Sequence, residues 1–233
     1  MTTVSLVIPA YNEAGRLPTF LQSIATYYAK SPASITEVLV VDDGSTDKTV
    51  AAAEQVGAGL PIMRVIKHAR NKGKGAAVRT GVMAATSDIV VFMDADGATA
   101  IDELPKMLTA LDGADIGVGN RWMPGADTER NSALRRLSGF VYRTYMGYFG
   151  LGDVDTMCGF KGYRRSVAQD LFAELQEERW LFDTEIAYKA VRRQYRTVNF
   201  PIKWRSMDGS KLDTVTLLKT ALKIWPLIRS LKK

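Results

Sequence analysis

The stretch VVFMDADGATA, residues 90–100, joins an apolar run to a pair of carboxylates. Its four apolar residues lead directly into Asp94 and Asp96, and a glycine follows. A short apolar run that ends at a turn signal is typical of a strand buried on both faces. If the extended backbone continues, side chains two residues apart point to one face, and two like charges there require a cation or a raised pKa. The stretch therefore predicts a buried strand that ends in a charged site.

The alternation of apolar strands and helices extends outward from this stretch through the first half of the chain. Apolar side chains recur at helical spacing between the strand-like runs. Short, fully apolar strands that alternate with helices indicate an α/β domain with a mostly parallel central sheet and helices on both faces. The expected strands are residues 4–8, 38–41, 62–66, 89–93 and 116–118, and the expected helices are residues 17–28, 75–85, 101–111 and a segment that follows Thr46-Asp47 and runs through Val56.

The second half is less regular. Residues 158–163 and 197–202 are expected to form strands, and residues 131–151, 181–192 and 214–231 to form helices. Two segments, residues 133–151 and 214–233, combine an apolar side with basic residues. Such a helix can lie in the headgroup layer of a membrane or pack on the core with its back in water, and both interpretations stay open. We see no repeat and no linker, so we expect one domain over residues 1–233.

Four polar clusters follow four of the expected strands. They are PAYNE at residues 9–13, DDGSTD at 42–47, DADG at 94–97 and GNRW at 119–122. In open parallel sheets, ligands bind in the crevice at the carboxyl ends of the strands. The four clusters therefore predict one shared site.

The aspartate pair in DADG suggests a divalent metal. Carboxylate oxygens suit Mg²⁺ or Mn²⁺, which usually takes one or two carboxylates together with substrate phosphates. A D-x-D pattern alone is weak, since Asp96 can equally cap a helix or lie in a solvated turn. Its place after a buried strand, beside three other polar clusters, favours the metal interpretation, with Asp94 and Asp96 as ligands.

The glycine-rich segment Asn71-Lys72-Gly73-Lys74-Gly75 resembles a phosphate loop only superficially. It does not match G-x-x-x-x-G-K-[ST], because alanine follows where serine or threonine is needed, and no G-x-G-x-x-G follows the first strand. These absences argue against a nucleotide triphosphatase and a dinucleotide enzyme. The glycines are better explained as allowing close backbone approach at the start of a helix.

Net charge and amino-acid composition restrict the classes of binding partner and the cellular compartment that we expect. The chain of 233 residues has a formal net charge of +6, which suggests an anionic partner, but the aspartate clusters would repel a nucleic acid. The single cysteine, Cys158, cannot form an internal disulfide, which fits a reducing compartment. We expect Cys158 to pack rather than react, and we do not expect catalysis from His68, the only histidine. Without an apolar run of about 18 residues or a signal-peptide pattern, we expect a cytoplasmic location.

Taken together, the motifs resemble family 2 glycosyltransferases with the GT-A fold. VSLVIPAYNE, EVLVVDDGSTDKT, N-x-GKG-x-AVR-x-G and D-x-D occur in that order, and the resemblance covers residues 4–212. In the second half, DADGAT, DTMCGFKGY, ERWLFDTE and W-x₄-GSKL are most similar to the dolichyl- and polyprenyl-phosphate glucosyltransferases, and less so to the mannose synthases. Mannose synthases tend to have glutamine two residues after the second aspartate as a further metal contact. Here that residue is Ala98, which favours glucose.

The resemblance also implies roles for individual residues and regions. Residues 1–120 would form the nucleotide-binding half, residues 121–212 the half that binds acceptor and phosphate, and residues 213–233 an amphipathic basic helix. The donor would be a nucleotide sugar and the acceptor a polyprenyl-phosphate lipid, so the chain would lie peripherally on the cytoplasmic face of a membrane. Residues that would border the base, the ribose or the phosphates are Pro9, Tyr11, Glu13, Asp42, Asp43, Lys74, Asp94, Ala95, Arg121, Arg135, Arg205 and Lys211, with Asp96 as the main metal ligand.

The resemblance implies an inverting transfer to a phosphate. Inverting transfer of a sugar is a single displacement through an oxocarbenium-like state. A phosphate monoester is already mostly anionic at neutral pH, so arginines such as Arg121 could replace a general base by positioning it. If a base is used, Asp183 and Glu185 are the candidates. They could equally orient Arg205 or cap the helix near Phe182.

The sequence leaves several alternative functions open. Within the family, the donor could be UDP-GlcNAc or GDP-mannose, or the acceptor could be a hydroxyl group, as in polysaccharide synthesis. A sugar nucleotidyltransferase would need a glycine-rich, arginine-containing loop after the first strand, and PAYNEAGR has one glycine. A nucleic-acid-binding protein would require a basic stripe without the acidic clusters. The sequence does not predict the oligomeric state.

Overall fold

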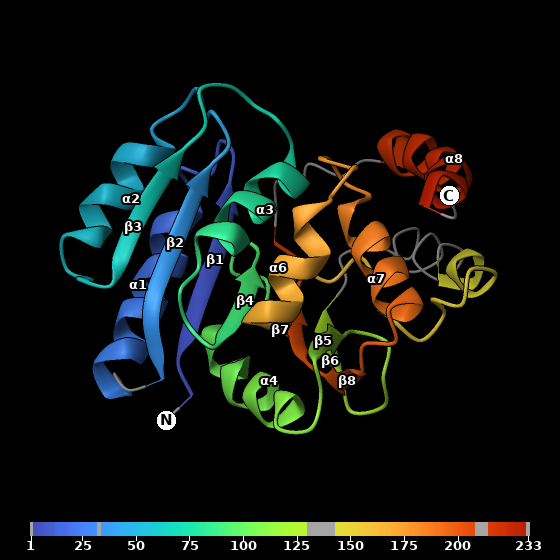
Figure 1. Ribbon diagram of the computed structural model, residues 1–233. Coiled ribbons are helices and arrows are strands. Elements are labelled where there is room, and N and C mark those ends of the chain that lie inside the picture. Colours follow the sequence, from blue (N-terminus) through green and yellow to red (C-terminus); the bar gives the residue numbers. More distant parts are fainter. Residues whose placement is uncertain (1, 32–33, 130–142, 208–213, 232–233) are drawn as a thin grey trace.

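The computed structural model describes residues 2–31, 34–129, 143–207 and 214–231, with the side chains of residues 214–222 excepted. Its centre is a seven-stranded sheet in the order β3-β2-β1-β4-β7-β5-β8, shown in Figure 1. The strands are β1 (Val4–Ala10), β2 (Ile35–Asp42), β3 (Met63–Lys67), β4 (Ile89–Met93), β5 (Ile116–Asn120), β7 (Phe160–Arg164) and β8 (Thr197–Pro201), and a separate pair is formed by β6 (Asp127–Glu129) and β9 (Lys203–Arg205).

Helices cover both faces of this sheet. One apolar core joins the sheet to α1, α2 and α4, and the other joins it to α3, α6 and α7. Alternate residues of β1 divide between the two cores, Leu6 to the first and Val7 to the second, as the two-residue strand period requires. The helices are α1 (Leu17–Lys30), α2 (Thr49–Gly57), α3 (Lys74–Ala84), α4 (Leu104–Leu111), α6 (Arg165–Ala173), α7 (Phe182–Arg192) and α8 (Thr214–Leu231), with a 3₁₀ turn η1 (Ile101–Glu103).

The prediction of a mostly parallel sheet is confirmed, with one exception. β1 pairs in parallel with both β2 and β4, so Leu6 lies opposite Val38 on one side and Val91 on the other. β7 runs antiparallel between β4 and β5, and β8 is parallel to β5. A hydrophobic run reports that a strand is buried but does not report its direction, so the reversal of β7 could not be read from residues 158–163.

Most expected elements are present within a few residues of their predicted bounds. The sequence interpretation missed α6, whose buried face is Val167, Ala168, Leu171 and Phe172, and it missed the short pair β6 and β9. Of the expected helix over 131–151, residues 130–142 lie outside the described residues. The described remainder is helical over 143–147 and then turns.

The C-terminal helix packs beside α7 over a third, smaller core. Ile224 and Ile228 are buried against Met146, Leu181 and Tyr188. This confirms a core-facing side for α8. The opposite side is not covered by the described residues, since Trp225 is 63% exposed and Tyr148, on the neighbouring turn, is 83% exposed. None of the described helices is both long and apolar enough to cross a membrane.

Candidate active site

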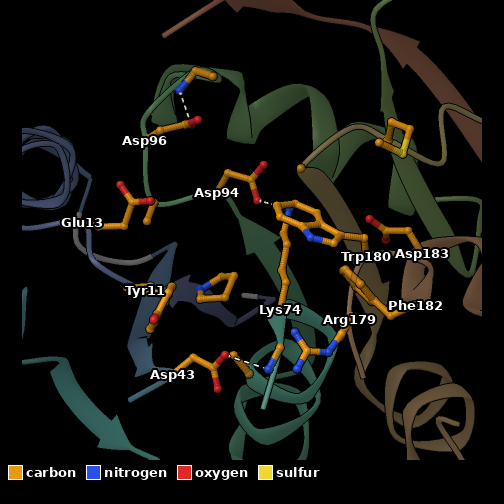
Figure 2. A pocket seen from close by; sticks show the side chains of 18 of the residues that line it. Tyr11, Glu13, Asp43, Lys74, Asp94, Asp96, Arg179, Trp180, Phe182 and Asp183 are labelled. Carbon is orange, nitrogen blue, oxygen red and sulfur yellow. Dashed lines mark hydrogen bonds and ion pairs between the residues drawn. The ribbon is translucent and has the colours of Figure 1, made fainter. Parts of the chain in front are cut away.

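A pocket of about 450 Å³ opens at the carboxyl ends of β1, β2, β4 and β5. The predicted convergence of the polar clusters is therefore observed for residues of all four. Figure 2 labels side chains from the loops that follow β1, β2 and β4, from the start of α3, and from the segment that leads into the first turn of α7. Ten predicted site residues line the pocket: Pro9, Tyr11, Glu13, Asp43, Lys74, Asp94, Ala95, Asp96, Arg121 and Asp183.

Lys74 neutralises the first carboxylate of the acidic pair. Its Nζ lies 2.6 Å from Asp94 Oδ1, and its ammonium lies over the rings of Phe92 and Trp180. Burial alone would lower the pKa of Lys74, but the carboxylates of Asp94 and Asp183 outweigh it, and the pKa is raised above its usual value. Lys74 therefore stays charged in the pocket, where it can balance a carboxylate or a phosphate.

The second carboxylate of the pair is less well neutralised. Asp96 Oδ1 accepts a hydrogen bond from Ala98 N at 3.0 Å, and Asp96 Oδ2 lies 3.9 Å from Arg16 Nη1. Burial, together with the charge of Asp94, raises the pKa of Asp96. A raised pKa means that negative charge is costly at this position. A cation in the pocket would remove that cost.

Asp43 holds the turn that precedes α3. Its Oδ1 accepts from Lys72 N at 2.9 Å and its Oδ2 accepts from Gly73 N at 2.8 Å. His68 lies between Asp43 and Thr80, with Nδ1 2.8 Å from Asp43 Oδ1 and Nε2 2.9 Å from Thr80 Oγ1. Asp43 borders the pocket as predicted, and both its oxygens also bind protein groups.

The glycines before α3 allow another segment to approach closely. Gly73 has a φ of 117°, which favours glycine, and a Cβ there would overlap Glu178 O. Gly75 N and Ala76 N donate to the carbonyls of Arg179 and Glu178 at 3.2 and 3.0 Å. The first turn of α3 is therefore capped by main-chain carbonyls, while Asp43 holds the two residues before it. This agrees with the interpretation that these glycines serve close packing and do not form a phosphate loop.

Arg121 is fixed from two sides. Asp155 accepts from its Nε at 2.8 Å and from its Nη2 at 2.9 Å, and the ring of Trp204 lies 5.2 Å from the guanidinium carbon. Burial would raise the pKa of Asp155, but the adjacent Arg121 holds that pKa below its usual value. A bidentate pair of this kind fixes the plane of the guanidinium at the pocket wall. Asp155 is therefore a positioning residue that the sequence interpretation missed.

Replacing Asp155 with asparagine is expected to lower the free energy of unfolding by about 3–5 kcal/mol, because a buried guanidinium loses its charged partner. The KM for a phosphate-bearing substrate should also rise about 10-fold, since Arg121 would no longer be oriented. Chemical denaturation and steady-state kinetics measure both effects. The matched control is Asp127→Asn, which breaks an exposed pair with Arg205 and should leave both quantities nearly unchanged. Equal behaviour of the two variants would contradict the positioning role.

The two proposed base candidates lie in different surroundings. Asp183 lines the pocket, and its Oδ1 lies 3.2 Å from the buried Lys161 Nζ; burial raises the pKa of Asp183. Glu185 is fully buried and accepts from Gln176 N and Glu177 N, with Lys189 Nζ at 2.6 Å. The position of Glu185 argues against a role as base, because its carboxylate holds the segment before α7. Neither carboxylate orients Arg205.

Four further predicted residues either lie outside the pocket wall or cannot be placed. Arg205 lies on β9, where its guanidinium pairs with Asp127 at 2.8 Å and Glu129 at 3.3 Å. Asp42 is buried; Oδ2 accepts from Ser45 N at 3.2 Å, and among the described residues Oδ1 has no hydrogen-bond partner. Arg135 and Lys211 lie outside the described residues.

The pocket offers a metal few protein ligands. Among the residues that the structure describes, no group of three or more histidine, cysteine, aspartate and glutamate side chains is arranged to hold a metal ion. Asp96 and Asp94 are hard oxygen donors at one pocket wall, and the raised pKa of Asp96 indicates that the nearby cations only partly offset its burial and the charge of Asp94. These residues fit Mg²⁺ or Mn²⁺ provided that substrate phosphates complete the coordination.

Several residues in the pocket wall or directly behind it were missed from the sequence, although their motifs were visible. Arg16 belongs to PAYNEAGR, Asp155 and Gly159 belong to DTMCGFKGY, and Trp204 precedes the last basic cluster. Each has a contact with a residue distant in sequence, Asp96 for Arg16, Arg121 for Asp155 and Trp204, and Asp94 for Gly159, so no local pattern could assign that contact. Cys158 is fully buried, which raises the pKa of its thiol to about 12 and leaves it unreactive, as predicted.

A family model described as "Glycosyl transferase family 2" matches residues 5–172 of this chain. Dolichyl-phosphate beta-glucosyltransferase from Saccharomyces cerevisiae is 32% identical over 93% of this chain and 72% of its own length. The human protein of the same name is 34% identical over 90% of this chain and 69% of its own length.

Solved structures agree on the fold. A crystal structure of Mycobacterium tuberculosis glucosyl-3-phosphoglycerate synthase has a TM-score of 0.75 at 20% identity, covering 98% of this chain and 80% of that one. The same enzyme in complex with Mn²⁺, UDP and glucosyl-3-phosphoglycerate has a TM-score of 0.76 at 19% identity, covering 98% of this chain and 79% of that one. The expected GT-A arrangement of the sheet is therefore confirmed.

Proposed function

The chain belongs to glycosyl transferase family 2 and is therefore a glycosyltransferase, and we propose that it transfers glucose from UDP-glucose to a dolichyl or polyprenyl phosphate. The observation that carries this proposal is a pocket that holds both the acidic pair Asp94 and Asp96 and the fixed guanidinium of Arg121. The relatives named dolichyl-phosphate beta-glucosyltransferase support the choice of sugar and acceptor.

The donor occupies the wall formed by residues 1–120. Pro9 and Tyr11 border the base, and Glu13 and Asp43 border the base and ribose. Asp96, with Asp94 beside it, would hold a divalent ion, Mg²⁺ or Mn²⁺, which as a Lewis acid would neutralise the diphosphate leaving group when bound. Lys74 adds a buried positive charge beside the same phosphates. The small Ala98, which also lines the pocket, supports glucose over mannose as the transferred sugar.

The acceptor occupies the opposite wall, formed by residues within 121–212. Arg121 is held so that its guanidinium faces the pocket, and arginine binds phosphate through paired hydrogen bonds. A phosphate that is already anionic needs orientation more than deprotonation. Asp183 remains the one base candidate in the pocket. The raised pKa of Asp183 and its ion pair with Lys161 support a role in setting the electrostatic potential at the pocket wall that binds the acceptor.

We propose that the chain lies peripherally on the cytoplasmic face of a membrane, and the surface beside α8 supports the contact with a membrane. Trp225 and Tyr148 are exposed next to Phe149, whose ring lies 6.1 Å from that of Trp225. Tryptophan and tyrosine are enriched at membrane interfaces, and the exposed Lys223 and Arg229 lie on the same helix. This side of α8 would contact the headgroup layer while Ile224 and Ile228 hold the helix on the domain.

Replacing Trp225 and Tyr148 together with serine is expected to lower binding to vesicles of phosphatidylcholine and phosphatidylserine by roughly 10-fold, because two interfacial aromatic side chains are lost. Co-sedimentation with the vesicles measures the bound fraction. The control is Met83→Ser, which removes an exposed apolar side chain from α3. Unchanged binding of the double variant would refute the membrane role of this surface.

The test of the function is a transfer assay with purified protein, dolichyl phosphate and labelled UDP-glucose, UDP-GlcNAc or GDP-mannose. We expect a labelled lipid that forms from UDP-glucose and is released by mild acid, as a glycosyl phosphate is. A labelled lipid from another donor would correct the sugar, and label in an acid-stable product would correct the acceptor. No labelled lipid from any donor would overturn the lipid-phosphate assignment.

A further inference from the structure

Each carboxylate of the acidic pair faces a cation that belongs to the protein. Asp94 is paired with Lys74 from the start of α3, and Asp96 faces Arg16 from the residue that precedes α1. Figure 2 shows Lys74 reaching up to Asp94, and Asp96 on the side of the pocket nearest Glu13. In the protein alone, the charge of the acidic pair is thus partly balanced before any metal arrives.

Arg16 is held in place by a carboxylate of its own loop. Glu13 Oε2 accepts from Arg16 Nε at 2.7 Å, and Glu13 Oε1 accepts from Arg16 Nη2 at 2.6 Å. Glu13 is buried, and its main-chain nitrogen donates to Thr49 Oγ1 at 2.7 Å, which ties the loop to the start of α2. The bidentate pair leaves Nη1 as the end of the guanidinium that lies toward Asp96 Oδ2.

We propose that Arg16 is the resident counter-charge of Asp96 and competes with the divalent ion for that carboxylate. A bare ion must approach an aspartate that already has a positive neighbour, so its binding to the protein alone is weakened. The diphosphate of the donor carries negative charge that can pair with the Arg16 guanidinium in place of Asp96. Asp96 is then available to the ion, so the ion and the donor favour each other's binding. Arg16 is therefore a positioning residue that couples metal binding to donor binding.

This inference rests on the proposed metal role of Asp96, and direct binding of Mn²⁺ tests it without any transfer reaction. Free Mn²⁺ is measured by electron paramagnetic resonance as the protein is titrated, first alone and then with saturating UDP. Removing the guanidinium charge in Arg16→Met should tighten binding of Mn²⁺ alone by roughly 5- to 50-fold, within the usual range of coupling between sites. Because coupling is reciprocal, the enhancement of Mn²⁺ binding by UDP should shrink by a similar factor.

Three further variants separate the explanations. Arg16→Gln removes the same charge with a polar side chain and should behave as Arg16→Met does. The double variant Glu13→Gln with Arg16→Met removes the carboxylate that loses its partner, and it should keep the tighter binding. Arg64→Met removes a positive charge that pairs with Glu37 on another part of the sheet, and it should bind Mn²⁺ as the wild type does.

The outcomes distinguish this inference from the proposed metal site. Unchanged Mn²⁺ affinity in both Arg16 variants would overturn the inference. A return to wild-type affinity in the double variant would also overturn it, because the tighter binding in the single variants would then come from Glu13 acting as a new Mn²⁺ ligand. Asp96→Asn tests the premise, because it should weaken Mn²⁺ binding in the presence of UDP. If it does not, the metal site itself is wrong.

Discussion

Replacing Asp96 with asparagine is expected to reduce kcat for sugar transfer by roughly 10²- to 10³-fold, the usual cost of removing one group that stabilises developing charge in a transition state. Asparagine keeps the size of the side chain and its hydrogen bond from Ala98 N, but it loses the negative charge. The leaving diphosphate would then lose the cation held at its side. Initial rates at several Mn²⁺ and Mg²⁺ concentrations measure this effect.

The matched control for this prediction is Asp102→Asn, a charge change at an exposed position in η1, a few residues along the chain. It should retain activity, which would show that net charge alone does not matter. Removal of metal with EDTA should abolish transfer by the wild type, and added Mn²⁺ or Mg²⁺ should restore it. A fully active Asp96→Asn protein would refute the metal role.

Replacing Gly159 with alanine is expected to reduce kcat by roughly 10²-fold, through displacement of Asp94. Gly159 O accepts from Asp94 N at 3.0 Å, so the end of β4 and the residue before β7 lie against each other. A Cβ at residue 159 would overlap the Asp94 carboxylate itself. That carboxylate must turn away, and its ion pair with Lys74 at 2.6 Å must break.

The free energy of unfolding of Gly159→Ala should change little although kcat falls, because the group that the new Cβ overlaps is the end of one side chain. Thermal unfolding measures stability, and steady-state kinetics give kcat separately from KM. Gly113→Ala is the control, since the nearest group to its Cβ would be Arg196 Nη1 at 3.7 Å, an ordinary contact. An active Gly159→Ala protein would show that the position of Asp94 against this backbone is not required.

The sequence predicted those features that depend on local patterns. Apolar runs predicted β1 and β4 as buried strands, because a strand covered on both faces must be apolar throughout. The glycines at residues 73 and 75 were assigned to close packing because the phosphate-loop pattern was incomplete, and the structure shows the loop before α7 packed on them. Both inferences use neighbouring residues only.

The limits of local reasoning appear at the charged residues. Asp43, Glu13 and Asp183 were placed at the pocket, but their partners His68, Arg16 and Lys161 were not identified. Glu185 and Asp183 lie one helical half-turn apart in the same motif, yet one carboxylate points into a buried main-chain contact and the other toward the pocket. The motif cannot separate them, because the neighbours that decide come from β7 and from the segment before α7.

The sequence alone therefore predicted one shared site, because a parallel sheet brings the polar clusters that follow its apolar strands to one edge. The pairing of individual charged residues depends on the tertiary structure. Lys74 is 20 residues from Asp94, and Arg121 is 34 residues from Asp155. These pairs meet because α3 and β7 begin at the edge of the sheet where β4 and β5 end. Charge pairing acts through space over a few ångströms, whereas a sequence pattern reports only what is near along the chain.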